Sequence, residues 1–241
     1  MENKQKFLGM NILITGGAQR IGAAIVKMLA QHGANVIIHC NKSIEKAEQL
    51  LCCLSSGDHR IIVGDLRNYV ALVNQLDSLN INVDILINNA AIFNVQNIVE
   101  ESDSDIKDQM NINFFAPYAL MRWFYKQKTL TKGCIINFLD QRNVKADPYT
   151  GSYAISKKAL EQATLTGALQ FAPKVRVNGI APGPVLPPND YQGIGFERAL
   201  KNVPMQKKVE LESITRSVEF LIECEAITGQ ILYVDGGEHL S

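Results

Sequence analysis

The sequence of 241 residues lacks net charge, because 24 Lys and Arg residues balance 24 Asp and Glu residues. Without a basic excess there is no electrostatic signal for nucleic acid or for an anionic membrane, so neither is expected as a partner. No apolar run approaches the roughly 20 residues needed to span a bilayer, and the first residues do not form a signal peptide. These absences favour a cytoplasmic protein.

Cysteines are few, odd in number and not spaced as metal ligands, so no metal site is expected. Cys40, Cys52, Cys53, Cys134 and Cys224 are interpreted as reduced, mostly buried thiols. The adjacent pair, Cys52 and Cys53, lies on a helical amphipathic pattern, which favours a packing role over a redox role.

Short apolar runs alternate with helical patterns along the whole chain. The runs predict buried strands over residues 10–14, 35–39, 60–63, 83–87, 134–138, 175–180 and 231–234. The longest helices are expected over 105–127, with a bend at Pro117, and over 152–171. This alternation predicts an α/β protein: one three-layer Rossmann domain, 1–241, with a seven-stranded doubly wound parallel sheet. Pro and Gly interrupt the pattern at about 184–206, where a substrate loop is expected.

The first predicted strand ends in a glycine-rich turn that runs from Gly16 to Gly22. Glycines allow the backbone to approach a pyrophosphate, and the helix that follows offers free N–H groups. The turn departs from G-x-G-x-x-G, since Arg20 stands where a middle glycine is expected. A tight turn without a ligand is the alternative, but the position between strand and helix favours a dinucleotide site.

The end of the second strand indicates which dinucleotide is bound. An acidic residue there usually holds the ribose of NAD, whereas the additional phosphate of NADP needs cationic partners. No carboxylate follows His39 before Glu45, and Lys42 and Ser43 are able to bind a phosphate. A solvated lysine and a helix cap are the alternative. The pattern favours NADPH.

Tyr153 and Lys157 are four residues apart, so they share one face of a predicted helix. A lysine beside a phenol lowers the pKa of the phenol, which makes Tyr153 a candidate proton donor. Asp140 follows the fifth predicted strand, where the edge of a parallel sheet meets ligands. A Tyr-x-x-x-Lys pair is common by chance, so its weight depends on the rest of the chain.

Several motifs occur in the order and spacing of a known family, and the chain resembles the short-chain dehydrogenase/reductases over nearly its whole length. The motifs are Thr15-Gly16 to Gly22, Asp65-Leu66, Asn88-Asn89-Ala90, Asn113, Tyr153-x-x-x-Lys157, Pro182-Gly183 and Asp235-Gly236-Gly237. The resemblance implies a homotetramer with a small-molecule substrate. It also implies that Lys157 holds the nicotinamide ribose and that Asn113 supports a proton relay to Lys157.

The resemblance further implies a set of cofactor contacts along the chain. They are Gly16, Gln19, Arg20, Ile21, Asn41, Lys42, Ser43, Asp65, Leu66, Asn89, Ala90, Ala91, Tyr153, Lys157, Pro182, Gly183 and Val185. Asp65 is expected at the adenine edge, with a helix-cap role as the alternative.

Three departures from the family pattern narrow the resemblance. Asp140 stands where the family usually has Ser, Arg20 replaces a glycine, and Phe93 follows Asn-Asn-Ala. This combination resembles the pteridine reductase and dihydromonapterin reductase branch. It implies that Arg20, Phe93, Asp140 and Tyr153 bind the substrate, with Phe93 stacked on a pterin ring.

Reduction of a ring C=N bond needs a hydride on carbon and a proton on nitrogen. Asp140 is expected to feed that proton through Tyr153, or to accept a hydrogen bond from the amino edge of the pterin. In the alternatives, Asp140 only caps its loop and the substrate is a ketone or another carbonyl compound. A third possibility is an NADP-binding regulator without turnover, against which the intact pair of Tyr153 and Lys157 argues.

Overall fold

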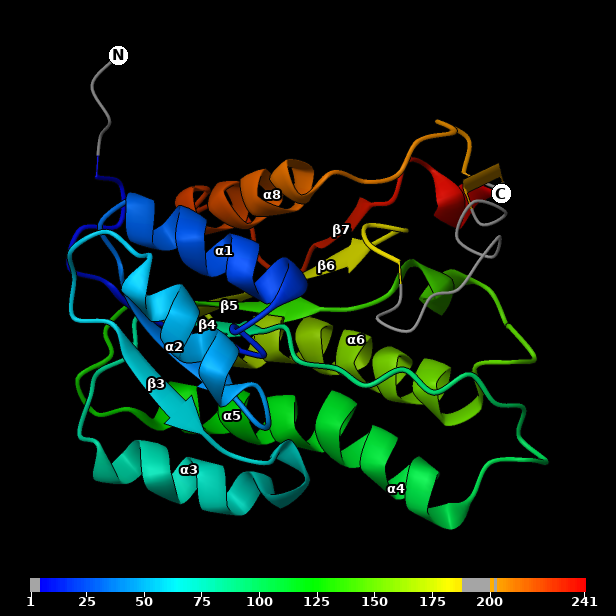
Figure 1. Ribbon diagram of the computed structural model, residues 1–241, viewed down its shortest axis with the longest axis horizontal. Coiled ribbons are helices and arrows are strands. Elements are labelled where there is room, and N and C mark those ends of the chain that lie inside the picture. Colours follow the sequence, from blue (N-terminus) through cyan, green and yellow to red (C-terminus); the bar gives the residue numbers. More distant parts are fainter. Residues whose placement is uncertain (1–4, 188–199, 202) are drawn as a thin grey trace.

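One parallel sheet of seven strands runs through the protein, with helices on both faces (Figure 1). The structure is a computed structural model that describes residues 5–187, 200–201 and 203–241. The strand order is β3-β2-β1-β4-β5-β6-β7, and every pairing is parallel. The predicted α/β class with a seven-stranded doubly wound sheet is confirmed.

The strands lie close to their predicted positions. They are β1 (Asn11–Thr15), β2 (Asn35–Cys40), β3 (Arg60–Val63), β4 (Ile85–Asn88), β5 (Gly133–Phe138), β6 (Val175–Pro182) and β7 (Ile231–Val234). The α-helices are α1 (Arg20–Gln31), α2 (Ile44–Cys52), α3 (Tyr69–Ser78), α4 (Asp103–Met110), α5 (Ala116–Lys126), α6 (Gly151–Phe171) and α8 (Leu211–Glu223). Short turns are η1 (Leu66–Asn68), η2 (Asn111–Phe115), η3 (Gln141–Val144) and η4 (Glu238–Leu240). Helix α8 lies in a part of the sequence for which no helix was predicted.

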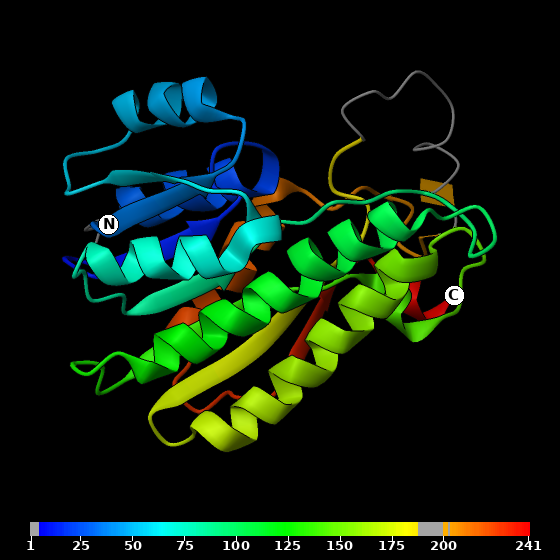
Figure 2. The same cartoon turned by 90° about the horizontal axis from the view of Figure 1, so that it is seen from below.

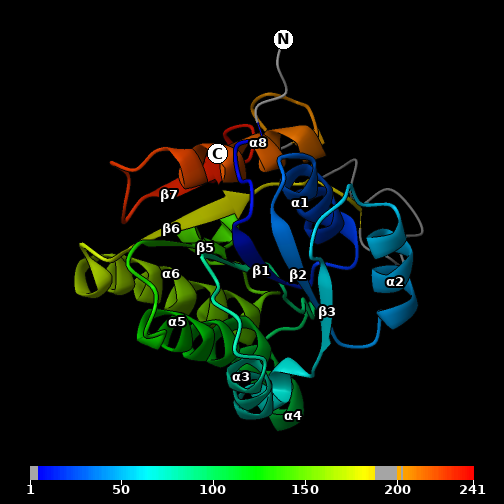
Figure 3. The ribbon, with the colours of Figure 1, turned by 90° about the vertical axis from the view of Figure 1, so that its left-hand side faces the viewer.

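Successive strand residues point to opposite faces, so the two faces of the sheet build two separate cores. Ile12 and Ile14 of β1 pack with residues of α1 and α8 on one face. Leu13, between them, packs with residues of α3 and α5 on the other face. Figures 2 and 3 show these helix layers on the two sides of the sheet. Burial on both faces explains why the strands read as continuous apolar runs.

The strand order reverses between β1 and β4, which lie side by side although two strands separate them in sequence. A crevice forms at such a point, because the chain leaves the two strands in opposite directions. Thr15 ends β1 beside Asn88 of β4, and its side-chain oxygen accepts hydrogen bonds from the N–H groups of Asn89 (3.0 Å) and Ala90 (3.1 Å). The glycine turn and the Asn-Asn-Ala motif are therefore fastened to each other.

The long helix predicted over 105–127 is divided into α4, a π-helical turn and α5. The wide turn, η2, comes directly before Pro117, which stands in the first turn of α5. Proline has no N–H group to donate to the carbonyl of Asn113 one turn earlier, so the regular ladder is interrupted there. The predicted irregularity at Pro117 is thus a wide turn that precedes it.

The expectation of mostly buried cysteines is wrong. Cys40 and Cys134 are buried, but Cys52 and Cys53 are exposed. Helix α2 buries Ala47 and Leu50, and the two cysteines follow at its C-terminal end, past that buried face. In the part of the chain that the structure describes, no helix combines the length and apolar character needed to cross a membrane.

The predicted substrate loop, 184–206, lies in large part outside the described residues, which omit 188–199 and 202. Its first residues follow β6 and are described.

Helix α1 packs so closely on the glycine turn that position 22 excludes a side chain. A Cβ at Gly22 would lie 2.2 Å from the carbonyl oxygen of Gly16 and 2.8 Å from Nδ2 of Asn89. We expect Gly22→Ala to lower the free energy of unfolding by about 2 kcal/mol or more, despite the better helix propensity of alanine. Chemical denaturation measures it, with Ala23→Ser as the control in the same helix. A loss as small as that of the control would contradict the packing argument.

Candidate active site

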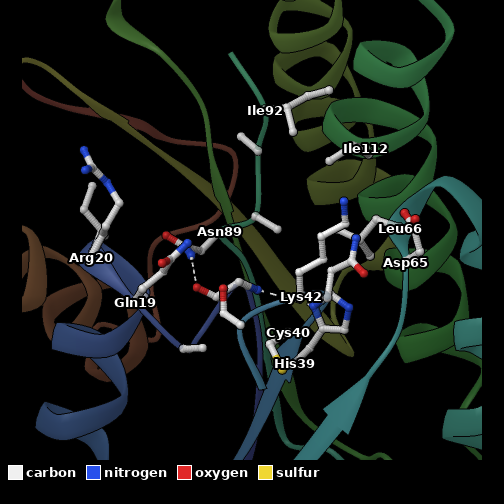
Figure 4. Close-up of a pocket in the computed structure, with 18 residues that line it drawn as sticks. Gln19, Arg20, His39, Cys40, Lys42, Asp65, Leu66, Asn89, Ile92 and Ile112 are labelled. Carbon is white, nitrogen blue, oxygen red and sulfur yellow. Dashed lines mark hydrogen bonds between the residues drawn. The ribbon is translucent and has the colours of Figure 1, made fainter. Parts of the chain in front are cut away.

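A pocket of about 340 Å³ opens at the carboxyl ends of β1, β2 and β4 (Figure 4). Figure 4 shows Gln19 and Arg20 on one side of it, Lys42 and Asp65 on the other, and Asn89 between them. Every predicted cofactor contact from Gly16 to Ala91 lines this one pocket. The lining residues that the sequence analysis did not assign are Ala18, Gly22, His39, Cys40, Ile92 and Ile112.

Arg20 has a backbone φ of +54°, in the left-handed region that favours glycine. This conformation explains why the family pattern has a glycine there and shows that the chain accepts strain to place an arginine. The guanidinium donates a hydrogen bond to the carbonyl oxygen of Leu186 (3.2 Å). Arg20 therefore links the first turn to the segment that follows β6.

The wall formed after β2 carries a cation and a hydroxyl at a helix start. Lys42 is exposed and lines the pocket, and Ser43 stands at the N-cap position of α2. In the described part of the chain, the Ser43 hydroxyl makes no capping hydrogen bond to this helix, so it stays available to a ligand. A phosphate at this place would meet a positive charge and the N-terminus of a helix.

Asp65 has an internal partner in the structure. Its carboxylate accepts a hydrogen bond from the Arg67 N–H (2.9 Å) and forms an ion pair with the guanidinium of Arg67 (2.6 Å). The hydrogen bond from Arg67 lowers the pKa of Asp65. The helix-cap role is realised, and the contact with an adenine stays a prediction.

His39 is buried at the end of β2 and holds two backbone segments of the pocket together. Its Nδ1 lies 3.4 Å from the N–H of Gly16, and its Nε2 lies 3.1 Å from the carbonyl oxygen of Gly64. A neutral ring with its proton on Nε2 satisfies both groups. Burial lowers the pKa of His39 to about 4, so the ring stays neutral near pH 7.

Asp140 and Tyr153 form a direct hydrogen bond, in which the Tyr153 hydroxyl donates to a carboxylate oxygen of Asp140 (2.6 Å). The other carboxylate oxygen of Asp140 accepts from the Arg142 N–H (2.8 Å). Burial of the phenol, followed by the charge of Asp140, raises the pKa of Tyr153 well above its usual value. The prediction of a pKa lowered by Lys157 is therefore wrong for this arrangement of the site.

Lys157 does not donate to the phenol but to the carbonyl oxygen of Phe138 (2.8 Å), at the end of β5. The side chain is 2% exposed, and this burial lowers its pKa to about 8. Lys157 remains largely protonated at neutral pH, with its charge directed to the carboxyl edge of the sheet. Tyr153 and Lys157 do not line the 340 Å³ pocket.

Asn113 is fully buried, and its side chain is already used by the protein. Its oxygen accepts from the Ile92 N–H (2.9 Å), while its nitrogen donates to the Ile92 carbonyl (3.0 Å) and to the Ser156 hydroxyl (3.2 Å). These bonds fasten the segment after β4 to η2 and α6. The predicted support of a proton relay by Asn113 stays a prediction.

Phe93 stands over the phenol with its ring in an edge-on contact, at 4.6 Å between the centroids of Phe93 and Tyr153. The side chain is 42% exposed, so it offers a surface to a ligand. The guanidinium of Arg142 lies over the ring, 5.0 Å from its centroid. The sequence analysis did not assign Arg142, and a ring that stacks on this face of Phe93 has to displace it.

The segment after β6 is placed by close packing against the C-terminal turn. A Cβ at Gly183 would lie 2.7 Å from the Cα atom of Asp235. Val185 is buried in the core between α1 and α8, so it would meet a cofactor through its backbone. Pro182, Gly183 and Val185 do not line the 340 Å³ pocket, and their cofactor contacts stay predictions.

The N-terminus of α6, which carries Tyr153, is clamped by Glu101. The Glu101 carboxylate accepts from the N–H (3.0 Å) and the hydroxyl (2.6 Å) of Ser152 and from the side-chain amide of Gln109 (3.2 Å). A negative charge at the N-terminus of a helix also interacts favourably with the helix dipole. No motif in the sequence indicated this role of Glu101, because its partner Ser152 lies far along the chain.

Residues 16–239 match the family described as Enoyl-(Acyl carrier protein) reductase. Two solved structures of a protein titled FolM alternative dihydrofolate reductase 1, in complex with NADP, are similar to the chain. The one from Brucella canis is 37% identical with a TM-score of 0.88, and covers 96% of this chain and 95% of its own. The one from Brucella suis is 36% identical with a TM-score of 0.90, and covers 96% of each.

Curated relatives are more distant and carry other names. Glucose 1-dehydrogenase of Gluconobacter oxydans is 28% identical over 97% of this chain and 93% of its own length. Oxidoreductase UcpA of Escherichia coli is 28% identical over 98% and 96%. The relatives are oxidoreductases, and their printed names span more than one substrate.

The neutral state of buried His39 makes stability depend on pH. An unfolded histidine takes up a proton near 6.5, whereas folded His39 does so at about 4. Between these values the unfolded chain binds more protons, so the free energy of unfolding falls as the pH is lowered, by up to about 3 kcal/mol. We expect His39→Gln to remove this part of the loss.

Urea unfolding of the wild type and His39→Gln at about pH 7 and about pH 4.5 measures the difference. His59→Gln is the control and should keep the wild-type loss. Equal losses in wild type and His39→Gln would contradict the assignment of a neutral, buried ring.

Proposed function

Because the chain belongs to the short-chain dehydrogenase/reductase family, we propose that it is an NADPH-dependent reductase of a pterin-type ring. The reaction converts a dihydropterin to a tetrahydropterin, with dihydromonapterin, dihydrobiopterin or dihydrofolate as candidate substrates. One observation carries the proposal: a carboxylate, Asp140, holds the hydroxyl of Tyr153 at 2.6 Å. Such a pair is able to pass a proton from Tyr153 to a ring nitrogen and to replace that proton through the carboxylate.

The pocket suits a phosphate-bearing dinucleotide. The glycine turn brings backbone to its edge, since Gly16 has a φ of +63° and a Cβ at Gly22 would lie 2.2 Å from the carbonyl oxygen of Gly16. The far wall presents Lys42 and the start of α2, where the extra phosphate of NADPH would bind. NADPH, once bound, supplies the hydride for the carbon of the C=N bond.

The proton for the ring nitrogen comes from Tyr153. Burial and the charge of Asp140 oppose a free phenolate, as the raised pKa of Tyr153 indicates. A relay avoids that cost: as the phenol proton leaves for the ring nitrogen, solvent water supplies a proton to Asp140, and Asp140 passes it along the 2.6 Å hydrogen bond to Tyr153. Lys157, buried and charged, stabilises the negative charge that builds up between them.

Phe93 and Arg20 bound the substrate in this proposal. Phe93 offers an exposed ring beside the phenol, on which a flat heterocycle stacks once Arg142 moves aside. Arg20 lies at the mouth of the cofactor pocket and reaches the segment after β6. The similarity to the Brucella FolM structures supports the same assignment, since their printed titles name a dihydrofolate reductase with NADP.

A ketone or another carbonyl compound is the second candidate substrate. The curated relatives favour it, because glucose 1-dehydrogenase and other oxidoreductases match nearly the whole chain. The homotetramer expected from the family resemblance stays a prediction, whichever substrate is used. The same holds for the cytoplasmic location expected from the composition.

NADPH oxidation with a panel of dihydropterins and dihydrofolate, set against a panel of ketones and aldehydes, tests the proposal. We expect turnover with at least one dihydropterin. Turnover confined to carbonyl compounds would establish the second candidate. Tight binding of NADPH without turnover of any compound in either panel would favour the third possibility, an NADP-binding regulator without turnover.

Replacing Asp140 with Ser tests the role of the carboxylate. We expect kcat with a dihydropterin to fall by about 100-fold or more, because the relay to Tyr153 is lost. The dissociation constant for NADPH, measured by fluorescence, should stay near the wild-type value. Asp147→Ser, in the same segment, is the matched control. An unchanged kcat in Asp140→Ser would make Asp140 a loop cap only.

Replacing Lys42 with Glu tests the choice of cofactor. We expect KM for NADPH to rise by about 10-fold or more and KM for NADH to fall, because a carboxylate repels the phosphate and accepts from a ribose hydroxyl. Lys27→Glu, an exposed position of α1, applies the same change of net charge elsewhere. Equal effects of the two variants on NADPH would show that Lys42 does not contact the phosphate.

A further inference from the structure

Glu238 carries a carboxylate oxygen that is buried and has no hydrogen-bond partner among the described residues. A buried carboxylate oxygen without a partner is costly, and a donor from a bound ligand would remove that cost. Burial raises the pKa of Glu238, while the charge of Arg142 opposes this shift. Arg142 and Asp140 are therefore close enough for their charges to act on the Glu238 carboxylate.

The backbone that presents Glu238 is held rigidly. Asp235, which is 2% exposed, accepts hydrogen bonds from the N–H groups of Gly237 (2.9 Å) and His239 (2.8 Å). It also pairs with the His239 ring at 2.7 Å. These bonds bracket position 238 on both sides, so the glutamate is presented at a fixed place after β7.

The turn that carries Glu238, η4, packs against η3, which carries Arg142. Figures 1 and 2 place the red C-terminal end beside the green segment that leads from β5 to α6. Arg142 in turn lies on the exposed ring of Phe93, next to Tyr153. Glu238 thus borders the substrate side of the site, and it does not line the 340 Å³ cofactor pocket.

Asp140 is less available for this purpose, because each of its oxygens already accepts one hydrogen bond. One accepts from the Tyr153 hydroxyl and the other from the Arg142 N–H. Among the described residues, Asn143 of η3 and Glu238 each carry a buried oxygen without a hydrogen-bond partner on this side of the site. Of the two, only Glu238 is a carboxylate, which is able to accept two N–H donors side by side.

We propose that Glu238 is a specificity-determining residue that accepts the two parallel N–H donors of an amino-pyrimidinone edge. This inference rests on the proposed function and names how the ring is recognised. A pterin presents an amino group and a ring N–H side by side, a pair of donors that one carboxylate accepts together. Binding of the ring moves Arg142 off Phe93, and the pterin edge supplies the hydrogen bonds that the Glu238 oxygen lacks.

The test compares a dihydropterin with the matching dihydrolumazine, in which an oxygen replaces the amino group. Wild-type enzyme should prefer the pterin, since the lumazine turns an acceptor toward the carboxylate. Glu238→Gln offers one acceptor and one donor, which match the lumazine edge. We expect the ratio of kcat/KM for pterin over lumazine to fall by about 10-fold or more in this variant, with KM for NADPH unchanged.

Glu238→Asp, which shortens the reach of the carboxylate, should raise KM for the pterin while kcat changes little. Glu212→Gln on the exposed side of α8 is the matched control. Melting temperatures and NADPH binding verify that each variant is folded.

An unchanged pterin-to-lumazine ratio in both folded Glu238 variants, with wild-type turnover of the pterin, would overturn this inference alone. A fall in kcat/KM that is equal for the two substrates would also overturn it, because Glu238 would then pair with Arg142 and not with the ring. Absence of wild-type turnover with any pterin would overturn the proposed function together with this inference.

Discussion

The hydrogen bond between Asp140 and Tyr153 is the interaction around which the site is built. It joins the end of β5 to α6, and its length of 2.6 Å places a carboxylate and a phenol in direct proton contact. In water such a contact is weak, but here the phenol is 6% exposed, and the low dielectric strengthens it. The same burial makes a free phenolate costly, which is why the proposed reaction replaces the Tyr153 proton through Asp140.

The fold holds this pair from two directions. Asn137 of β5 accepts from Asn88 of β4 and donates to Thr164 of α6, both at 2.8 Å, so the strands and the helix keep one register. At the other end, Glu101 fixes the start of α6 at Ser152. These buried hydrogen bonds limit the movement of β5 relative to α6, which keeps Asp140 and Tyr153 within hydrogen-bonding distance.

Most of the features that the sequence predicted correctly came from local patterns of residues. Apolar runs located the seven strands, and the motifs before Phe93 located the cofactor pocket, because those residues sit at strand ends that one sheet edge brings together. Contacts distant in sequence were not predictable: Arg142 on Phe93, and Glu101 on α6. The direction of the Tyr153 pKa shift that the spacing predicted was also wrong. Lys157 donates to the carbonyl oxygen of Phe138, and the Tyr153 hydroxyl donates to Asp140.

The central claim is that the protein reduces a ring C=N bond of a pterin with hydride from NADPH. Deuterium transfer measures this most directly. The enzyme is incubated with NADPH that carries deuterium on its reactive carbon and with a dihydropterin, and the product is analysed by mass spectrometry. The account predicts a tetrahydropterin with one deuterium on the carbon of the former C=N bond, while the new proton on nitrogen comes from solvent. A dihydropterin recovered without deuterium, while the label moves to a carbonyl compound in a parallel reaction, would contradict it.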